Sequence, residues 1–264
     1  MAIKVLVHGA LGKMGREIIN GLSADPDFSI VGAVDKKAAS DFLSVSDGAF
    51  SIPLSANLEL ILSKCQPQVM VDFSIAEATR AAIPLAANSR INLVIGTTGL
   101  NEKDMEEISK LCRTNHIGAV VSSNFTIGAA LMIHLSKIAA RYFDYVEIIE
   151  MHHEQKADAP SGTSITTAQA MLKARGKPFN NAKIKKETLS GTRGGELEGI
   201  ALHSLRMPGL MAHQEVILGE PGETLRIRHD TINRECYLPG IKRAIKEVVH
   251  REGLTIGLDT LLGL

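Results

Sequence analysis

The sequence predicts an α/β protein with two domains: a doubly wound parallel sheet, and an α+β domain with a mixed or antiparallel sheet. Over the first 123 residues, short apolar runs alternate with helical patterns, which is typical of parallel strands joined by helices. Over residues 199–232, strand-like segments follow one another with Gly and Pro between them, which favours antiparallel pairing. A chain of 264 residues is long enough for two domains of ordinary size.

The first domain is expected to span residues 1–123. The apolar run Ile3–Val7 is typical of a buried strand, and apolar residues at helical spacing then lead to a second strand at Ser29–Val34. The alternation continues with helices at Leu58–Cys65, Ala76–Ala87 and Glu102–Asn115, and with strands at Val69–Phe73, Ile91–Ile95 and Ala119–Val121. Pro84 is expected to kink or break the helix in which it lies.

The second domain is expected to span residues 124–235. It begins with a long amphipathic helix (Gly128–Phe143), a strand (Val146–Glu150) and a further helix (about Ser161–Arg175), before the antiparallel segments. A last helix over about Ile241–His250 and a strand at Leu254–Ile256 are expected to return to the first domain, which residues 236–264 would complete.

Charge and composition exclude several classes of protein. Lys plus Arg equals Asp plus Glu, at 29 each, so no global field draws the chain to nucleic acid or an anionic membrane. No apolar run approaches the roughly 20 residues that span a bilayer. A first strand at Ile3 leaves no room for a signal peptide, and three scattered cysteines favour reduced thiols. We expect a soluble, cytoplasmic protein.

A glycine-rich turn joins the first strand to the first helix. Gly9, Gly12 and Gly15 form a G-x-x-G-x-x-G variant of the dinucleotide fingerprint of a Rossmann-type domain. Glycines there let the backbone approach a pyrophosphate, which rests on the helix N-terminus. Asp35 lies at the end of the second strand, 20 residues beyond Gly15, where an acid accepts hydrogen bonds from the adenine ribose. The sequence therefore predicts NADH or NADPH as cofactor.

Three neighbouring features stay open at this point. Lys36 is suited to pairing with the 2′-phosphate of NADPH, or is an exposed loop charge, so the cofactor preference is not settled. Gly96–Gly99 follows another strand and is either a nicotinamide-ribose contact or an ordinary capped turn. The same two interpretations apply to Ser123–Thr126.

The densest polar cluster in the chain is Glu150–Thr163, which follows an apolar strand. Pro160 and Ser161 mark a helix start whose free N–H groups and dipole favour an anion. Lys156 would add a point charge suited to a carboxylate, and a histidine supplies a proton donor that titrates near neutrality. Reduction of an unsaturated acceptor by hydride needs such a donor.

Other interpretations compete for this cluster. The pair His152 and His153 would serve as metal ligands if partner Cys or His residues lay nearby, but the sequence has no such cluster and we predict no metal. The pair would otherwise be structural, hydrogen-bonded loop residues. Ser161–Thr163 would also act as a helix cap, which is compatible with anion binding.

The chain resembles the 4-hydroxy-tetrahydrodipicolinate (dihydrodipicolinate) reductase family. The family signature E-x-H-H-x-x-K-x-D-A-P-S-G-T matches Glu150–Thr163 without a gap. The resemblance extends over essentially the whole chain, through residues 7–16, 72–74, 96–99, 124–125, 203–206, 213, 219–220, 229, 234 and 239–240.

The resemblance implies an activity and a set of site residues. It implies NAD(P)H-dependent reduction of a cyclic imine dicarboxylate at C4, with loss of water, in the diaminopimelate route to lysine. His152 and Lys156 would then act in proton transfer, and the substrate would be held by His153, Gly162 and Thr163. The cofactor-contacting stretches would be Gly9, Ala10, Leu11, Gly12, Lys13, Met14, Asp35, Gly96, Thr97, Thr98, Ser123, Asn124, Phe125 and Thr126. A homotetramer formed through the sheet of the substrate domain is also implied.

The chain departs conservatively from the family pattern. Lys13, Asp35 and Thr126 stand where many relatives have Arg, Glu and Ser, and Lys36 replaces a frequent Arg, which puts NADPH preference in doubt. Two other functions stay open: a dinucleotide-sensing protein without catalysis, and a dehydrogenase of a small amino or hydroxy acid. Both fit the His-His-x-x-Lys run less well.

Overall fold

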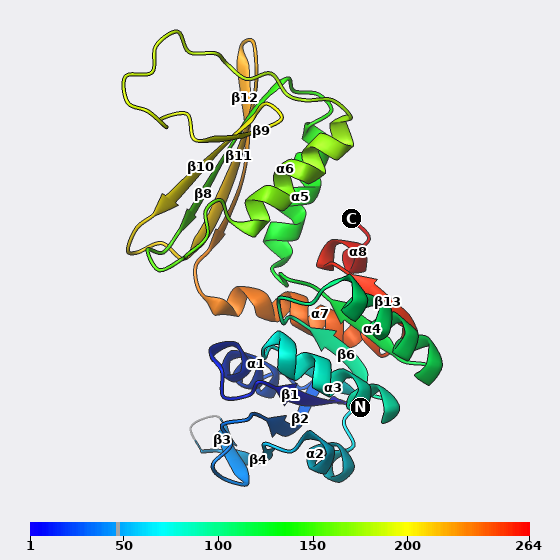
Figure 1. The fold of residues 1–264 in the computed structure, drawn as a ribbon. Coiled ribbons are helices and arrows are strands. Elements are labelled where there is room, and N and C mark those ends of the chain that lie inside the picture. The colour runs from blue at the N-terminus through cyan, green and yellow to red at the C-terminus, as the bar shows by residue number, and fades with distance from the viewer. Residues whose placement is uncertain (46–47) are drawn as a thin grey trace. The chain divides into compact units, whose positions relative to one another are not determined.

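The chain divides into two compact units in a computed structural model, which describes residues 1–45 and 48–264 (Figure 1). Unit 1 comprises Met1–Ile127 and Arg234–Leu264, and unit 2 comprises Gly128–Asn233. These boundaries differ by a few residues from those expected from the sequence.

Unit 1 contains an eight-stranded sheet in the order β13-β7-β6-β5-β1-β2-β4-β3, in which every neighbouring pair except β3 and β4 is parallel. Its strands are β1 (Ile3–His8), β2 (Phe28–Val34), β3 (Phe42–Val45), β4 (Phe50–Ser55), β5 (Val69–Asp72), β6 (Asn92–Ile95), β7 (Gly118–Val121) and β13 (Gly253–Ile256). Its helices are α1 (Lys13–Ser23), α2 (Leu58–Cys65), α3 (Ala76–Asn88), α4 (Glu102–Asn115), the 3₁₀ turn η1 (Arg234–Tyr237), α7 (Leu238–Val248) and α8 (Leu258–Leu262). The predicted α/β class with a doubly wound parallel sheet is confirmed.

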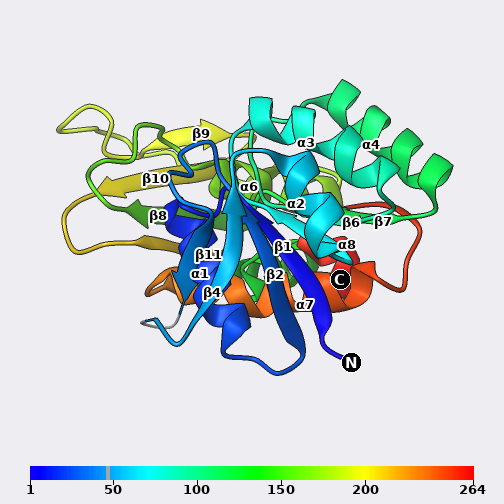
Figure 2. The same ribbon diagram turned by 90° about the horizontal axis from the view of Figure 1, so that it is seen from below.

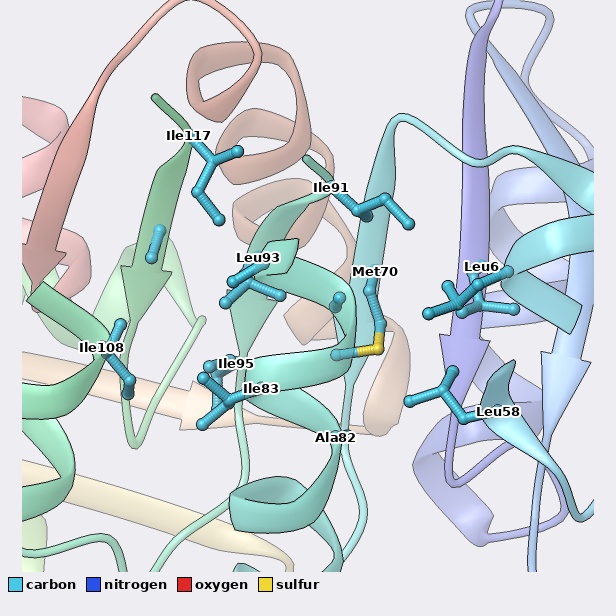
Figure 3. Packing of buried hydrophobic residues seen from close by; sticks show 14 of the residues in the cluster. Leu6, Leu58, Met70, Ala82, Ile83, Ile91, Leu93, Ile95, Ile108 and Ile117 are labelled. Atoms are coloured by element: carbon cyan, nitrogen blue, oxygen red, sulfur yellow. The ribbon is translucent and has the colours of Figure 1, made fainter. Parts of the chain in front are cut away.

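Helices cover both faces of this sheet, as parallel strands buried on two sides require. Helices α2, α3 and α4 pack on one face, and α1 and α7 lie on the other (Figure 2). The first face holds a cluster built from aliphatic side chains, in which Leu6 of β1 and Leu58 of α2 point toward Met70 of β5 (Figure 3). The core therefore follows from the near-continuous apolar runs of the strands.

Local sequence fixes where α4 and α2 begin. Asn101 caps α4 by accepting from the Asp104 N–H, while the Asp104 carboxylate accepts from the Asn101 N–H in return. Asn57 caps α2 in the simpler way, by accepting from the Leu60 N–H. Helix α3 runs through Pro84 from Ala76 to Asn88, so the break considered for that position does not occur. Strands β3 and β4 form a hairpin that the sequence did not predict, because its apolar residues are few and partly exposed.

The order in which strands are added to the sheet reverses between β1 and β5. From β1 the chain continues to β2 on one side, and β5, β6 and β7 then add on the other side. Ligands of open α/β sheets bind at such a switch point, outside the carboxyl ends of the strands. The carboxyl ends of β1, β5 and β6 therefore define the edge where a ligand of unit 1 is expected.

A buried carboxylate ties these three strand ends together. Asp72, at the end of β5, is fully buried, and its Oδ2 lies 2.9 Å from Nδ1 of His8 at the end of β1. Its Oδ1 accepts from the Ser74 N–H (2.9 Å), the Ser74 hydroxyl (2.7 Å) and the Thr97 hydroxyl (3.0 Å) beyond β6. Burial raises the pKa of Asp72, but the hydrogen bonds and charge of His8, together with the Ser74 hydrogen bonds, outweigh it and hold the pKa below its ordinary value.

Unit 2 contains a five-stranded mixed sheet in the order β12-β11-β8-β10-β9 and two helices. Only β8 and β10 pair in parallel. Its elements are α5 (Ile127–Ala139), β8 (Tyr145–His152), α6 (Gly162–Arg175), β9 (Gly195–Leu197), β10 (Ile200–Arg206), β11 (Ala212–Glu220) and β12 (Glu223–Thr231). Ala139 of α5 and Met171 of α6 pack with Ile148 of β8 on one face of this sheet, so the mixed α+β architecture is confirmed.

Two further observations concern the cysteines and the apolar character of the helices. The cysteines Cys65, Cys112 and Cys236 are all free thiols. In the part of the chain that the structure describes, no helix combines the length and the apolar character needed to cross a bilayer.

Asp72→Asn is expected to lower the free energy of unfolding by about 1–3 kcal/mol at pH 7, because a charge-assisted buried hydrogen bond becomes a neutral one. The lowered pKa of Asp72 sets the pH dependence. The contribution of ionised Asp72 to the free energy of unfolding is present above 3.8, the ordinary pKa of an aspartate. It is lost as the pH falls through the lower pKa of the folded state. Urea denaturation followed by circular dichroism, which suits a chain without Trp, measures both. The exposed Asp41→Asn is the control. A difference between Asp72→Asn and wild type that stays constant from pH 7 down to about pH 2 would contradict this account.

Candidate active site

The polar cluster of unit 2 lies where β8 ends, α6 begins and β10 ends. Strand β8 runs two residues further than predicted, to His152, because its pairing continues with Arg206 of β10 and Ala212 of β11. Glu150 and His152 are two positions apart and share a face of the strand. Their pairing partners on β10, Ser204 and Arg206, share that face. The parallel register therefore brings Arg206 to the cluster from 56 residues away.

Glu150 is the centre of the hydrogen-bond network. Its carboxylate is 1% exposed and accepts one hydrogen bond on each oxygen from the Arg206 guanidinium, both at 2.8 Å. The Ser161 N–H donates to Oε1 at 3.1 Å. Burial raises the pKa of Glu150, but hydrogen bonds from Arg206, Ser204 and His152 outweigh it and hold the pKa below its ordinary value. Glu150 is therefore a carboxylate at neutral pH.

His152 is oriented by this carboxylate. Its Nδ1 lies 2.6 Å from Oε2 of Glu150, and the side chain is 15% exposed. Burial lowers the pKa of His152, and the charges of Lys156 and Arg206 add to that lowering. The hydrogen bond and charge of Glu150 oppose it, and the net pKa lies below its ordinary value. His152 is thus a half-buried group whose surroundings favour the neutral ring.

The loop between β8 and α6 carries the remaining predicted residues. Lys156 is largely covered, and its ammonium group donates to Asp158 at 2.6 Å. The guanidinium of Arg206 donates to the carbonyl of Asp158 at 2.6 Å, which holds this loop to the end of β10. His153 is half-buried, and its ring has no hydrogen-bond partner among the described residues. The ammonium group of Lys156 is therefore already paired within its own loop, whereas the ring of His153 is not paired in the described structure.

The start of α6 presents free backbone donors. The Ala159–Pro160 peptide bond is cis. Ser161 caps the helix by accepting from the Ser164 N–H at 3.2 Å. In the described structure the N–H groups of Gly162 and Thr163 have no protein acceptor, and a Cβ added to Gly162 would meet nothing within 4 Å. Open space beside two unpaired donors at a helix N-terminus suits an anionic group.

In unit 1 the glycine turn packs tightly enough to exclude side chains. Gly9 has φ +79°, and a Cβ there would lie 2.8 Å from the Phe73 carbonyl oxygen. A Cβ on Gly15 would collide with the carbonyl oxygen of Gly9. Gly12 is the N-cap of α1 and supplies no side-chain cap, so the first N–H groups of this helix face outward unblocked. This geometry fits a pyrophosphate.

The other residues of the turn differ in exposure. Ala10 is buried, Leu11 and Met14 are half-buried, and Lys13 is exposed. Asp35 joins this turn in space, since its carboxylate accepts from the Leu11 N–H (3.0 Å) and the Lys37 N–H (2.9 Å). Lys36, next to Asp35, is exposed.

The predicted turn after β6 divides into buried and exposed residues. Gly96 lies against the ring of Phe73, which leaves no room for a Cβ. Thr97 is buried, and its hydroxyl also accepts from the Ser74 N–H at 3.0 Å, so its side chain belongs to the Asp72 network. Thr98 is exposed beside it.

The segment after β7 is similarly divided. Phe125 is fully buried, with its ring centroid 5.6 Å from that of Phe73, and Thr126 is buried near Cys236. The Asn124 side chain accepts from the Thr126 N–H at 2.8 Å, which shapes the turn. Ser123 is exposed.

Reasoning from sequence assigned no role to several residues of these networks. Arg206 binds Glu150 and the loop, and His8, Asp72 and Ser74 connect the strand ends of unit 1. Their positions at the last residues of strands, or just beyond, were the signal available. Among the described residues, no three His, Cys, Asp or Glu side chains gather as metal ligands.

Known proteins resemble the chain over its full length. The family profile described as dihydrodipicolinate reductase, N-terminus, matches residues 3–125, and the C-terminus profile matches residues 128–262. The chain is 52% identical to 4-hydroxy-tetrahydrodipicolinate reductase of Dehalococcoides mccartyi strain CBDB1, covering 99% of each chain. It is 43% identical to the protein of that name from Moorella thermoacetica, covering 98% of each.

A solved structure shows the same fold in both units. Dihydrodipicolinate reductase from Paenisporosarcina sp. TG-14, with dipicolinate bound, aligns with a TM-score of 0.89 and 35% identity, over 98% of this chain and 99% of that one. With both profiles matched and close relatives aligned from end to end, the chain belongs to the dihydrodipicolinate reductase family.

Proposed function

We propose that the chain reduces 4-hydroxy-tetrahydrodipicolinate to tetrahydrodipicolinate with NADH or NADPH, in the diaminopimelate route to lysine. The main support is the polar cluster that follows β8, which contains His152, Lys156 and the N-terminus of α6 with its unpaired N–H groups. The chain that carries this cluster belongs to the dihydrodipicolinate reductase family. The reaction consumes one hydride and one proton and releases one water. The site must therefore hold a dicarboxylate and deliver a proton.

The start of α6 is the proposed site for the substrate carboxylates. The N–H groups of Gly162 and Thr163 are unpaired in the described structure, and the helix dipole favours negative charge there. The ring of His153 and the ammonium group of Lys156 would contribute further donors. The related structure from Paenisporosarcina binds dipicolinate, a dicarboxylate of similar size.

Proton transfer is assigned to His152 and Lys156. His152 is half-buried beside the helix start, and its Nδ1 is occupied by Glu150, which leaves Nε2 for the substrate. The ammonium group of Lys156 would stabilise negative charge that develops on the substrate during reduction and donate as a second acid.

Unit 1 is the proposed dinucleotide-binding domain, and unit 2 is the proposed substrate-binding and oligomerisation domain. Reduced nicotinamide dinucleotide, when bound, supplies the hydride. The residues that fit it are the Gly9–Met14 turn, Asp35, the turns at Gly96–Thr98 and Ser123–Thr126, and Lys36. Asp35 accepts two backbone hydrogen bonds and keeps lone pairs for ribose hydroxyls, whereas Lys36 is exposed and suited to a 2′-phosphate. Both NADH and NADPH therefore fit.

A homotetramer is proposed through the outer face of the unit 2 sheet. The cluster that includes α5 and α6 covers one face, whereas Ile149, Met151 and Leu205 lie on the other and are partly exposed. Apolar residues interleave there with the hydrogen-bonded pair of Glu147 and His203, which suits a face covered by another copy.

The proposed reaction is tested by supplying its substrate from pyruvate and aspartate semialdehyde through the upstream synthase. Loss of the absorbance of NADH or NADPH is followed with the full chain. We expect oxidation with at least one cofactor, and the ratio of the two rates gives the cofactor preference. Rates equal to the enzyme-free control with both cofactors would reject the proposed function.

His152→Asn is expected to lower kcat by about 10²–10⁴-fold, because a proton donor is lost. The dissociation constant for NADH, measured by fluorescence, should stay within about twofold, since the Gly9–Met14 turn is unchanged. His153→Asn is the matched comparison, and it should raise KM more than it lowers kcat. Parallel losses of turnover and cofactor binding in His152→Asn would contradict the assigned role.

The oligomeric state is measured by light scattering during size-exclusion chromatography. A homotetramer has four times the 28.4 kDa mass of one chain. We expect Leu205→Glu, which places a charge on the outer sheet face, to reduce that mass, while Leu60→Glu on α2 leaves it unchanged. A wild-type monomer would reject the tetramer.

A further inference from the structure

Glu150 joins three elements of the proposed active site in unit 2: β8, β10 and the start of α6. Its carboxylate binds the ring of His152 on its own strand, the guanidinium of Arg206 on β10 and the Ser161 N–H at the start of α6. A carboxylate that is 1% exposed is costly to bury, so these partners must compensate it fully. The network therefore fixes three elements relative to one another.

We infer that Glu150 is a positioning residue of the reductase reaction, which sets the tautomer of His152 so that Nε2 carries the reacting proton. This inference rests on the proposed role of His152 as proton donor. It extends that role to a residue that need not touch the substrate, and to Arg206 as the group that keeps Glu150 ionised.

The tautomer follows from hydrogen-bond chemistry. An ionised carboxylate only accepts hydrogen bonds, so His152 Nδ1, 2.6 Å away, must be the donor. Neutral His152 therefore carries its proton on Nδ1 and leaves Nε2 as a lone pair. Protonation then adds the second proton at Nε2 alone, and donation of that proton returns the same neutral tautomer. The ring need not flip during turnover.

Arg206 keeps Glu150 in the accepting state. Its two terminal nitrogens bind the two carboxylate oxygens at 2.8 Å each, the bidentate geometry of strong Arg–carboxylate pairs. The guanidinium also donates to the Asp158 carbonyl, so it holds the loop that carries Lys156. The same ion pair thereby links the orientation of His152 to the position of the second proposed donor.

Charged groups from three parts of unit 2 act on the His152 ring or on its charged neighbours. Glu150 lies on its own strand, Arg206 on β10, and Lys156 and Asp158 on the following loop. Of these, Glu150 favours the protonated ring, whereas Lys156 and Arg206 oppose it. Removing the charge of Glu150 therefore lowers the pKa of His152 further. If turnover requires protonated His152, the rate then begins to fall at a lower pH than it does in wild type.

Glu150→Gln tests the inference because the amide preserves size. The amide N–H donates to Nδ1 and so favours the Nε2–H tautomer. In that neutral ring Nε2 already carries a proton, so it cannot take up the reacting proton. We expect kcat at pH 7 to fall by about 10²-fold or more. The descending limb of the kcat–pH profile should move to lower pH, and the NADH dissociation constant should change less than twofold. Glu154→Gln, an exposed carboxyl on the same loop, should leave the profile unchanged.

The resting wild-type protein provides a second readout that does not depend on the variant or on turnover. Nitrogen-15 NMR of labelled histidine, assigned with His152→Asn, reports which ring nitrogen carries the proton. A neutral Nδ1–H tautomer supports the inference, and a neutral Nε2–H tautomer overturns it, as does a Glu150→Gln profile that does not shift. Absence of reductase activity in wild type would reject the proposed function instead, and the tautomer would still decide the role of Glu150.

Discussion

The buried ion pair between Glu150 and Arg206 is the constraint on which the geometry of unit 2 depends. A carboxylate without access to water needs a partner on each lone-pair side, and a guanidinium with two parallel N–H groups meets that need. Because Arg206 lies on a strand parallel to β8, the pair forms only when the register of β8 and β10 is correct. The ion pair thus joins the sheet topology to the orientation of His152.

Unit 1 also has a buried, hydrogen-bonded carboxylate at the edge of its sheet. Asp72, like Glu150, is a buried carboxylate near a strand end that accepts from a histidine, a backbone N–H and side chains of a neighbouring strand end or turn. In unit 1 the bound histidine, His8, is itself almost buried, so the network fixes the strand ends beneath the glycine turn. In unit 2 the histidine lies beside free helix donors. The two networks therefore differ in the surroundings of the histidine, since His152 has unpaired N–H groups beside it in the described structure, whereas His8 is almost buried.

The sequence predicted the parallel sheet and the glycine turn because their signals are local: apolar runs set the strands, and glycines mark positions where a Cβ collides with backbone. The polar run from Glu150 to Thr163 was equally local. Arg206 was not assigned a role, because its partner is 56 residues away and only strand register brings them together. The hairpin β3–β4 was missed because its residues are mostly exposed or half-buried, so burial gave it no clear pattern. The extension of β8 to His152 depended on pairing with β10 and β11, which no local pattern contains.

The central claim is that a dicarboxylate rests on the start of α6 and meets Nε2 of His152. A crystal structure of the full chain with NADH and dipicolinate (pyridine-2,6-dicarboxylate) tests this claim most directly. We predict carboxylate oxygens within hydrogen-bond distance of the Gly162 and Thr163 N–H groups, Nε2 of His152 facing the ring, and Nδ1 still bound to Glu150. A dicarboxylate bound away from α6, or a His152 ring turned to present Nδ1 to it, would contradict the account.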